Sequence, residues 1–295
     1  MSDGPRLLAP AWFRHRLAGR VRLGGAIPTT GGIDFFDLGD AEEMSLLASA
    51  GLTAERLAER LDAGERLDQA PVFEVPVARP GKILCLGKNF AAHAAEFGAA
   101  VPEEPIFFTK LPDTLLPHEG VVQIPHWLQS RVDHEVELAV ILGFPDPEQR
   151  GRKYVASAEA LSLVAGYSIL NDVTARAMQG TDRGAQRPWL RCKSFDTFCP
   201  LGPWVVPADA LPQVHDLEIG LTVNGDQKQH SRTSLMVVGI AEAIAYLSRH
   251  TTLRPGDLIA MGTPAGVSAL APGDRMVASI EHLGELVNTV QLERE

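Results

Sequence analysis

The chain has 295 residues, 45% of them apolar and 22% charged, which is typical of a globular protein with about two domains' worth of length. With 27 basic and 37 acidic residues, its formal net charge of −10 argues against a nucleic-acid or anionic-membrane partner that covers the whole surface. The 3 cysteines lack C-x-x-C spacing, and no apolar run reaches the ~18 residues of a membrane-spanning helix. We therefore expect a cytoplasmic protein without a disulfide framework, a thiolate zinc site or a membrane partner.

Residues 1–78 are predicted to form a small N-terminal α+β domain. Short strand-like segments with Gly-Gly turns come first, and two helical stretches follow. In the second stretch, Thr53 to Ala63, leucines and alanines recur at helical spacing among charged residues. The sequence VPVARPG at 75–81 has the proline and glycine content of a boundary, so we place the second domain at 79–295.

The pattern after this boundary changes to short β-type runs separated by Gly, Pro, Asn and Asp. It is typical of a mixed, mainly β architecture and not of alternating βαβ units, so the predicted fold class is α+β, mainly β. The predicted strands are Ile83–Leu86, Ile106–Thr109, Glu135–Leu142, Leu163–Leu170, Leu217–Val223, Leu258–Met261, Met276–Ile280 and Leu286–Leu292. Asn224-Gly225 predicts a hairpin turn, and apolar residues along one face predict a helix from Ser234 to Arg249.

The segment DHEVELAVIL at 133–142 carries two glutamates at alternate positions of a predicted strand. Side chains two apart on a strand point to the same face, with Cα atoms ~6.6 Å apart, so Glu135 and Glu137 are aimed at one place. Two ionised carboxylates in a partly buried place need a cation, and hard oxygen ligands select Mg²⁺, Mn²⁺ or Ca²⁺. The alternative is a polar strand face in water, which a lone Glu-x-Glu does not exclude.

A third carboxylate, Asp172, follows the predicted strand Leu163–Leu170 and begins a predicted helical turn. Positions i, i+4 and i+7 of a helix share a face, which would align Asp172 with Arg176 and Gln179. A metal-type carboxylate would then lie beside a guanidinium and an amide that can bind an acid. In the alternative interpretation, Asp172 caps the turn and pairs with Arg176.

Three further segments carry groups that suit acid–base and anion-binding chemistry. His93 and Glu96 are spaced i, i+3 on a predicted short helix, where a carboxylate orients an imidazole as a base for water. Lys193 lies among aromatic residues, where its ammonium can meet a substrate oxyanion. Thr263, in a GTPAG turn, offers a hydroxyl to a carboxylate. Each group is also compatible with a bland alternative: a solvated pair, a surface lysine or an ordinary turn.

Taken together and in order, these segments resemble the fumarylacetoacetate hydrolase family, in its smaller bacterial and mitochondrial type. The resemblance covers about 80–292 and is carried by GKNFAAHAAEF, PIFFTK, DHEVELAVILG, GYSILNDVTARAMQ, KSFDTFCPLGPWV, VNG, LRPGDLIAMGTPAGV, PGD and LGELVNTV. It implies a mixed β-sandwich or β-roll catalytic domain behind the small N-terminal α+β domain, and a homodimer.

The resemblance also implies a role for each singled-out residue. The implied ligands of a divalent metal, Mg²⁺ with Mn²⁺ or Ca²⁺ as alternatives, are Glu135, Glu137 and Asp172. The implied catalytic residues are His93 and Glu96, on a helix that covers the substrate, and Lys193. The positions that match substrate-binding residues are Arg176, Gln179, Thr263 and Lys110.

The implied activity is hydrolysis of a C–C bond in a small 2,4-dioxo acid such as an acylpyruvate or fumarylpyruvate. The same site would equally serve an isomerase, hydratase or decarboxylase of 2-oxo or 2-hydroxymuconate-type diacids, as in aromatic catabolism. A third interpretation is a non-catalytic protein that binds an oxo acid through the metal, which the set of acid–base groups argues against.

Overall fold

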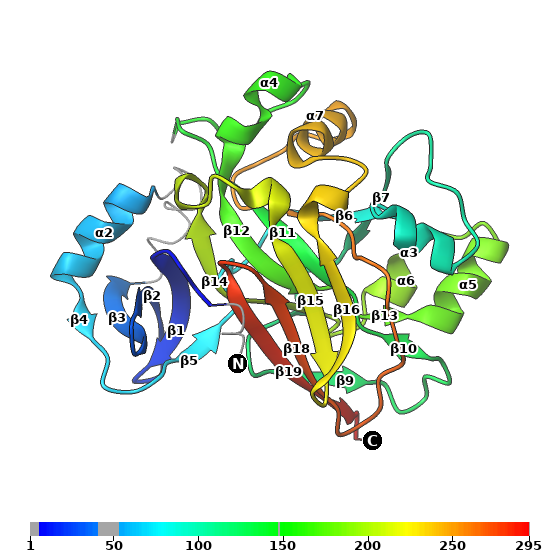
Figure 1. The fold of residues 1–295 in the computed structure, drawn as a ribbon, viewed down its shortest axis with the longest axis horizontal. Helices are drawn as coiled ribbons and strands as arrows, with labels where there is room; N and C mark the ends of the chain where they lie inside the picture. The colour runs from blue at the N-terminus through cyan, green and yellow to red at the C-terminus, as the bar shows by residue number, and fades with distance from the viewer. Residues whose placement is uncertain (1–5, 41–52, 147, 295) are drawn as a thin grey trace.

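The structure is a computed structural model that describes residues 6–40, 53–146 and 148–294. Its largest sheet contains strands from both predicted domains (Figure 1). The main path of this sheet is, in order, β4 (Glu65–Arg66), β3 (Gly32–Asp40), β2 (Arg20–Thr29), β1 (Ala11–Leu17), β14 (Cys199–Pro207), β12 (Val164–Asn171), β11 (Val136–Leu142), β17 (Leu258–Ala260), β6 (Ile83–Gly87) and β7 (Ile106–Lys110). Off this path, β5 (Val72–Glu74) pairs with β1, and β8 (Leu115–Leu116) pairs with β14. Strands along the path run antiparallel except β17 and β6, which run parallel.

A second sheet lies across β11 and β12 of the first (Figure 1). Its strands are, in order, β16 (Asp226–Arg232), β15 (Glu218–Val223), β18 (Arg275–Ile280), β19 (Gly284–Leu292) and β9 (Val121–Ile124). Apolar residues of both sheets, among them Leu138, Ile169 and Leu221, belong to one buried cluster. A short ribbon pairs β10 (Val132–Asp133) with β13 (Thr174–Ala175). This packing of mixed sheets confirms the predicted, mainly β fold class.

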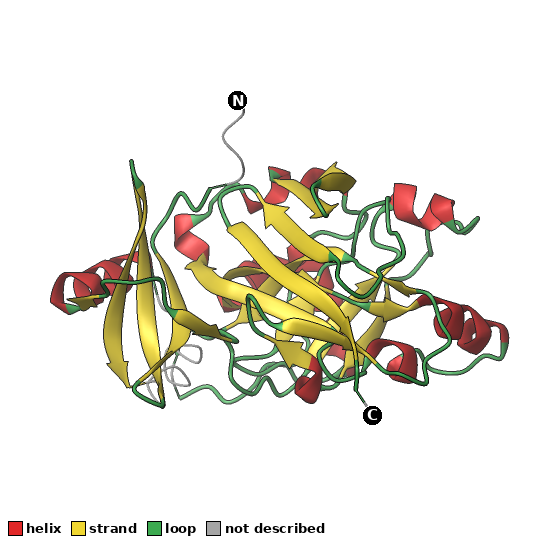
Figure 2. Ribbon diagram, turned by 90° about the horizontal axis from the view of Figure 1, so that it is seen from below, coloured by secondary structure: helices red, strands yellow, loops and turns green. Residues whose placement is uncertain are grey.

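The helices lie around the edges of the sheets. The α-helices are α2 (Ala54–Ala63), α3 (Ala91–Glu96), α4 (Ser157–Ala160), α5 (Arg176–Gly184), α6 (Leu190–Lys193) and α7 (Ile240–His250). Single 3₁₀ turns occur at Pro112–Thr114, Leu161–Leu163, Ala208–Ala210, Val214–Asp216 and Thr233–Leu235. Figures 1 and 2 show α3, α5 and α6 together at the end of the molecule opposite α2. The candidate site residues of α3, α5 and α6 therefore lie at one end.

The N-terminal strands continue the large sheet. Trp12 of β1 pairs with Val205 of β14, and both side chains are buried in a cluster that also contains Leu61 of α2. Helix α2 confirms the second predicted helical stretch, with the Thr53 hydroxyl accepting from the Arg56 amide as N-cap. The first predicted stretch lies outside the described residues. The division of the chain at residue 78 stays a prediction.

Every predicted strand of the second domain is observed, with its ends displaced by no more than two residues. The predicted hairpin is also confirmed, because Asn224 and Gly225 join β15 to β16 with φ of 53° and 88°. The predicted strands do not include β14. Its nine residues, CPLGPWVVP, are buried throughout and rich in proline, so they show neither alternation nor ordinary strand composition.

The predicted helix from Ser234 to Arg249 is wrong in its first part, because α7 begins only at Ile240. Asn89 holds the preceding backbone extended: the Val238 amide donates to Asn89 Oδ1 at 2.7 Å, and Asn89 Nδ2 donates to the Val238 carbonyl at 3.0 Å. The Val237 amide also donates to the Asn89 carbonyl, at 2.8 Å. These backbone groups are therefore not available to a helix, which starts after Gly239.

We expect Asn89→Ala to lower the free energy of unfolding by about 2–3 kcal/mol, because it leaves buried backbone groups without partners. Asn89 also donates to the Met261 carbonyl at 2.8 Å, so one buried side chain joins three separate segments. Urea unfolding measures the change. The matched control is Gln129→Ala, which removes an exposed amide and should change stability by less than about 0.5 kcal/mol. Equal effects of the two substitutions would contradict this assignment.

Candidate active site

Three buried carboxylates meet where β11 begins and β12 ends. The antiparallel register places Val136 opposite Asn171, so Glu135 and Asp172, one residue further on each strand, are neighbours. The Asp172 amide donates to the Glu135 carbonyl at 2.8 Å, and the Glu135 amide donates to Asn171 Oδ1 at 2.8 Å. Ligand atoms of Glu135, Glu137 and Asp172 all lie within 4.8 Å of one another. The prediction that these side chains share one place agrees with this geometry.

Two lysines hold the carboxylates from the interior. Lys193 Nζ donates to Glu135 Oε2 at 2.8 Å and also to Asp172 Oδ2. Lys110 Nζ donates to Asp172 Oδ1 at 2.7 Å, to the Val173 carbonyl at 3.3 Å and to the Lys193 carbonyl. All three hydrogens of Lys110 therefore have protein acceptors, and it lies behind Asp172 and not among the residues that line the cavity.

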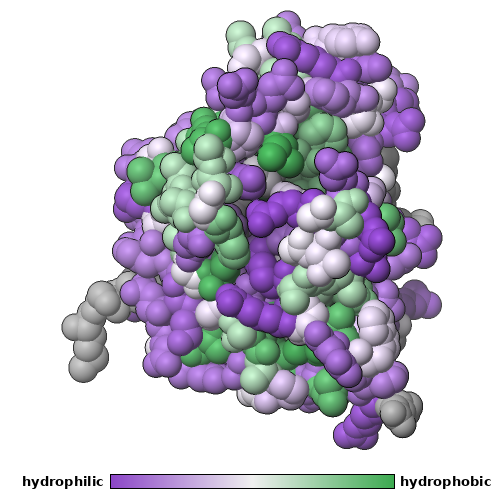
Figure 3. All heavy atoms as spheres, turned by 90° about the vertical axis from the view of Figure 1, so that its right-hand side faces the viewer, coloured by the Kyte–Doolittle hydropathy of each residue, from purple (hydrophilic) through white to green (hydrophobic). Residues whose placement is uncertain are grey.

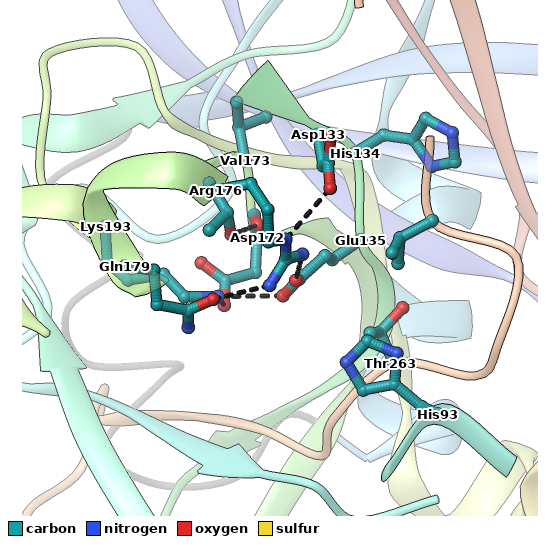
Figure 4. A network of polar contacts seen from close by, with 12 residues as sticks. His93, Asp133, His134, Glu135, Asp172, Val173, Arg176, Gln179, Lys193 and Thr263 are labelled. Carbon is teal, nitrogen blue, oxygen red and sulfur yellow. Dashed lines mark hydrogen bonds and ion pairs between the residues drawn. The ribbon is translucent and has the colours of Figure 1, made fainter. Parts of the chain in front are cut away.

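Arg176 holds the opposite side of the same cluster (Figure 4). Its guanidinium donates to Asp133 Oδ2 at 2.9 Å, to Gln179 Oε1 at 2.5 Å and to Glu135 Oε1. The predicted helical face that would include Asp172 is wrong, because β13 separates Asp172 from α5. Arg176 and Gln179 do share a face of α5, and Asp172 joins them through the sheet.

The two glutamates experience opposite electrostatic environments. Burial would raise the pKa of Glu135, but the positive charges of Lys193 and Arg176 hold it below its ordinary value. Burial raises the pKa of Glu137 well above its ordinary value, and the negative charges of Asp172 and Glu135 raise it further. Glu137 accepts a hydrogen bond from the Gly262 amide at 2.7 Å, which offsets this only in part.

These donors fit a divalent cation. All three residues offer hard carboxylate oxygens, which suit Mg²⁺ or Mn²⁺. The raised pKa of Glu137 indicates that the surrounding protein does not fully compensate its negative charge. A cation beside Glu135, Glu137 and Asp172 would supply that compensation. The identity of the ion stays a prediction.

An imidazole faces the cluster from α3. His93 Nδ1 lies 3.0 Å from Glu96 Oε2, and Glu96 Oε1 accepts from the Gly266 amide at 2.7 Å. Because Glu96 can only accept when ionised, Nδ1 carries the hydrogen and the lone pair of Nε2 remains available. Figure 4 places His93 beside Thr263, across the site from Lys193 and Gln179. The predicted His–Glu pair is therefore present, and its histidine lines the cavity.

A cavity connects these groups to solvent, and Figure 3 shows this face hollowed, with polar side chains inside and apolar ones on its flanks. Aromatic rings form one wall: Lys193 Nζ lies 4.8 Å from the Phe108 ring centroid, and Phe108 lies 5.6 Å from Trp189. On the other wall, Phe97 packs edge-on to His93 at 5.3 Å and under the Arg176 guanidinium at 5.0 Å. The cavity is lined by Leu86, Gly87, Lys88, His93, Ala94, Phe97, Phe108, Glu135, Glu137, Asp172, Arg176, Gln179, Gly180, Arg183, Trp189, Lys193 and Thr263.

Sequence reasoning missed several of these lining residues. Lys88 has a φ of 57°, which a non-glycine residue seldom adopts and which often marks a functional site. Arg183 is four residues after Gln179 on α5, so the i, i+4 spacing of a helix is a signal that could have found it. Trp189 follows α5, and no sequence pattern places it at the cavity. Phe108 belongs to a predicted strand, but which face it presents depends on the pairing of β6 with β7.

Residues 82–291 match the family described as fumarylacetoacetate (FAA) hydrolase C-terminal. The chain belongs to the fumarylacetoacetate hydrolase family. This result confirms the family predicted from the ordered motifs, and with it a mainly β enzyme of that family.

Three relatives of this fumarylacetoacetate hydrolase family protein are informative. A mitochondrial oxaloacetate tautomerase of Bos taurus is 41% identical over 226 residues, which cover 74% of this chain and 69% of that protein. The structure of a fumarylacetoacetate hydrolase from Exiguobacterium antarcticum has a TM-score of 0.81 and 31% identity, and covers 97% of this chain and 100% of that one. A fumarylpyruvate hydrolase from Pseudomonas aeruginosa in complex with Mn²⁺ and pyruvate has a TM-score of 0.67 and 35% identity, and covers 77% of this chain and 93% of that one.

The predicted homodimer and cytoplasmic location stay predictions. Within the described residues, the structure contains no helix that is both long and apolar enough to span a membrane.

We expect Glu137→Gln to raise the stability of the metal-free protein and to weaken Mn²⁺ binding by about 100-fold or more. The pKa of Glu137 is raised in the folded state, so ionised Glu137 destabilises the fold increasingly as pH rises above the pKa of the unfolded chain. The stability gained by the amide should therefore grow as the pH rises above about 5. Thermal unfolding with EDTA and with Mn²⁺ measures both effects.

The control for this substitution is Glu59→Gln on the exposed face of α2, which should change neither quantity. A Glu137→Gln protein that is destabilised without metal, or that is stabilised by Mn²⁺ as strongly as the unchanged protein, would contradict this account of the cluster.

Proposed function

We propose that this protein is a divalent-metal-dependent hydrolase that cleaves a C–C bond in 2,4-dioxo acids of the acylpyruvate or fumarylpyruvate type. The observation that carries the proposal is that His93, paired with Glu96, lines the same cavity as the three clustered carboxylates. The fumarylpyruvate hydrolase relative, whose structure holds Mn²⁺ and pyruvate, supports this substrate class.

A divalent ion held by Glu135, Glu137 and Asp172 would act as a Lewis acid that favours development of negative charge on the 2-oxo group of the substrate. The buried position of all three ligands keeps this charge in a low-dielectric environment, where electrostatic stabilisation is strongest. Lys110 keeps Asp172 in place from behind, so the ligand set is organised before substrate arrives.

His93 is suited to activate water. With Nδ1–H directed to Glu96, Nε2 can take a proton from a water molecule, and the resulting hydroxide attacks the distal carbonyl carbon of the substrate. The bond between that carbon and the adjacent methylene carbon then breaks, and its electron pair forms the enolate of pyruvate. The proton held by His93 neutralises this enolate, so the products are pyruvate and a second acid. Glu96 stabilises the imidazolium without leaving its Gly266 amide.

The cations of the cavity suit the negative charges of such a substrate. Lys193 Nζ uses two hydrogens on Glu135 and Asp172, which leaves one for a substrate oxyanion. Gln179 lies on the same wall, where Arg176 fixes its carbonyl oxygen and leaves its NH₂ group to donate to a carboxylate. These groups favour a 2-oxo acid over a neutral carbonyl compound.

Two further cations of the cavity suit a second acid group of the substrate. Lys88 and Arg183 both line the cavity, and within the described part of the chain neither side chain makes a hydrogen bond or ion pair. Trp189 lines the same cavity and packs on Phe108 and close to Gly87, the residue before Lys88. We therefore include a distal carboxylate, as in fumarylpyruvate, in the proposed substrate class.

A second candidate, tautomerisation of oxaloacetate, is favoured by the 41% identity to the bovine tautomerase. In that reaction His93 would move a proton between C3 and the enol oxygen, and no water would be consumed. The two candidates require the same metal ligands and the same base. They differ in the substrate that is turned over and in whether a C–C bond is cleaved.

We expect His93→Gln to lower kcat by about 100-fold to 10,000-fold, because it removes the proposed general base. The assays are pyruvate release from fumarylpyruvate and enol decay of oxaloacetate, each with Mn²⁺ and with EDTA. The matched control is His215→Gln on an exposed turn, which should retain full activity. Cleavage without metal, or unchanged cleavage by His93→Gln, would contradict the proposed hydrolase, and tautomerisation without cleavage would select the second candidate.

We expect Arg183→Gln to raise KM for fumarylpyruvate by about fivefold and to leave KM for acetylpyruvate unchanged, because only the first has a distal carboxylate. The control is Arg187→Gln, which lies beyond the end of α5 and outside the cavity lining. A KM change of the same size for both substrates would show that Arg183 does not bind the distal acid group.

A further inference from the structure

Gln229 is the fully buried polar residue of an otherwise exposed or half-buried strand, β16. The other side chains of β16 are exposed or half-buried, whereas Gln229 has 0% exposure. The register explains its direction: Leu221 of β15 pairs with Gln229 and Thr222 pairs with Gln227, so Lys228 is an extra residue in a β-bulge. Bulges redirect neighbouring side chains, and this one turns an amide into the interior beside β11.

The amide of Gln229 makes every hydrogen bond that it can make. Its Nε2 donates to the Thr263 hydroxyl oxygen and to the Pro264 carbonyl, both at 2.8 Å. Its Oε1 accepts from the Val136 amide at 3.1 Å and faces His134 Nδ1 at 3.0 Å. A backbone carbonyl can only accept and a backbone amide can only donate, so these contacts determine which end of the amide is which.

The orientation of the Gln229 amide also determines where the hydrogens of His134 and Thr263 lie. Because Oε1 can only accept, His134 carries its hydrogen on Nδ1, and its Nε2 accepts from the Ser268 hydroxyl at 2.9 Å. Because Nε2 can only donate, the Thr263 oxygen accepts from it, and the Thr263 hydrogen must point elsewhere. Thr263 lines the cavity, and within the described residues its hydroxyl has no protein acceptor.

We propose that Gln229 is a positioning residue of the active site, which fixes the Thr263 hydroxyl as a hydrogen-bond donor to an acid group bound in the cavity. This inference rests on the proposed function, since it assigns the donor that the 2-oxo acid meets beside His93. Gln229 does not touch the cavity itself, so its effect passes through Thr263.

Close backbone packing keeps Thr263 in register with Gln229. A Cβ on Gly266 would lie 2.0 Å from the Lys228 carbonyl oxygen, and the φ of Gly266 is 102°. Only glycine permits this approach of the 262–266 turn to the bulged strand. The same turn supplies the Gly266 amide to Glu96, so the bulge supports both Thr263 and the His93–Glu96 pair.

The test is a double-mutant cycle between Gln229→Met and Thr263→Val, read out by binding of oxalate and of pyruvate to the Mn²⁺-loaded protein in calorimetry. We expect each single substitution to weaken oxalate binding about tenfold, and the double variant to bind no more weakly than Thr263→Val alone. Thr263→Ser keeps the hydroxyl and should bind within about twofold of the unchanged protein. Gln227→Met, on the exposed face of β16, is the matched control and should have no effect.

A second variant covers the case in which Gln229→Met does not fold. Gln229→Glu keeps the acceptor for Val136 and His134 but removes the donor to Thr263, so the hydroxyl should turn away from the cavity and oxalate binding should weaken about tenfold. A ligand-free readout is the NMR signal of the Gln229 side-chain NH₂, which should shift in Thr263→Val and not in Thr263→Ser.

Effects of Gln229→Met and Thr263→Val that multiply in the double variant would overturn the inference, as would unchanged oxalate binding by either Gln229 variant. Those outcomes leave the proposed function intact. A wild-type protein that binds neither oxalate nor pyruvate would instead overturn the proposed function and this inference with it.

Discussion

The structure depends on keeping three carboxylates together inside an apolar sandwich. Antiparallel pairing of β11 with β12 places Glu135 and Asp172 side by side, and the pleat of β11 adds Glu137. Such a cluster is stable only if cations compensate it. Lys193 and Lys110 supply positive charge from the interior, and Arg176 supplies it from α5. Burial and the negative charges of Asp172 and Glu135 raise the pKa of Glu137, so the negative charge of this third carboxylate is not fully compensated. The residual negative charge is the property that suits the site to a divalent ion.

The remaining parts of the site come from segments far apart in the chain. Hydrogen bonds to the backbone and close packing at glycines hold these segments in place. Asn89 joins the start of α3 to the end of β17 and to the segment before α7. A Cβ on Gly262 would lie 2.7 Å from Asn89 Cβ, so the turn that carries Thr263 packs directly on this asparagine. The His93–Glu96 pair and Thr263 are therefore positioned by one compact set of contacts at the end of the large sheet.

The same groups can serve hydrolysis or tautomerisation, because both begin with negative charge on a 2-oxo acid and a single base. What distinguishes the reactions is whether water reaches the distal carbonyl. The cations Lys88 and Arg183 and the aromatic residues Phe97, Phe108 and Trp189 line the same cavity. Hydrogen-bond direction is a further constraint, since the Thr263 hydroxyl accepts from the amide of Gln229 and cannot direct its own hydrogen there.

Local patterns in the sequence determined eight strands of the second domain, the α2 helix, the Asn224-Gly225 hairpin, the pairing of His93 with Glu96 and the family, because each depends on residues close together in the chain or on their order. Tertiary structure decided the rest. Strand β14 is buried on both faces and so lacks alternation, Asn89 delays the start of α7, and Lys110 lies behind Asp172 instead of in the cavity. Gln229 shows the reason most clearly. A bulge one residue earlier turns it inward, two of its partners lie in a turn 34 and 35 positions later, and the other two lie 93 and 95 positions earlier, so no local pattern contains that information.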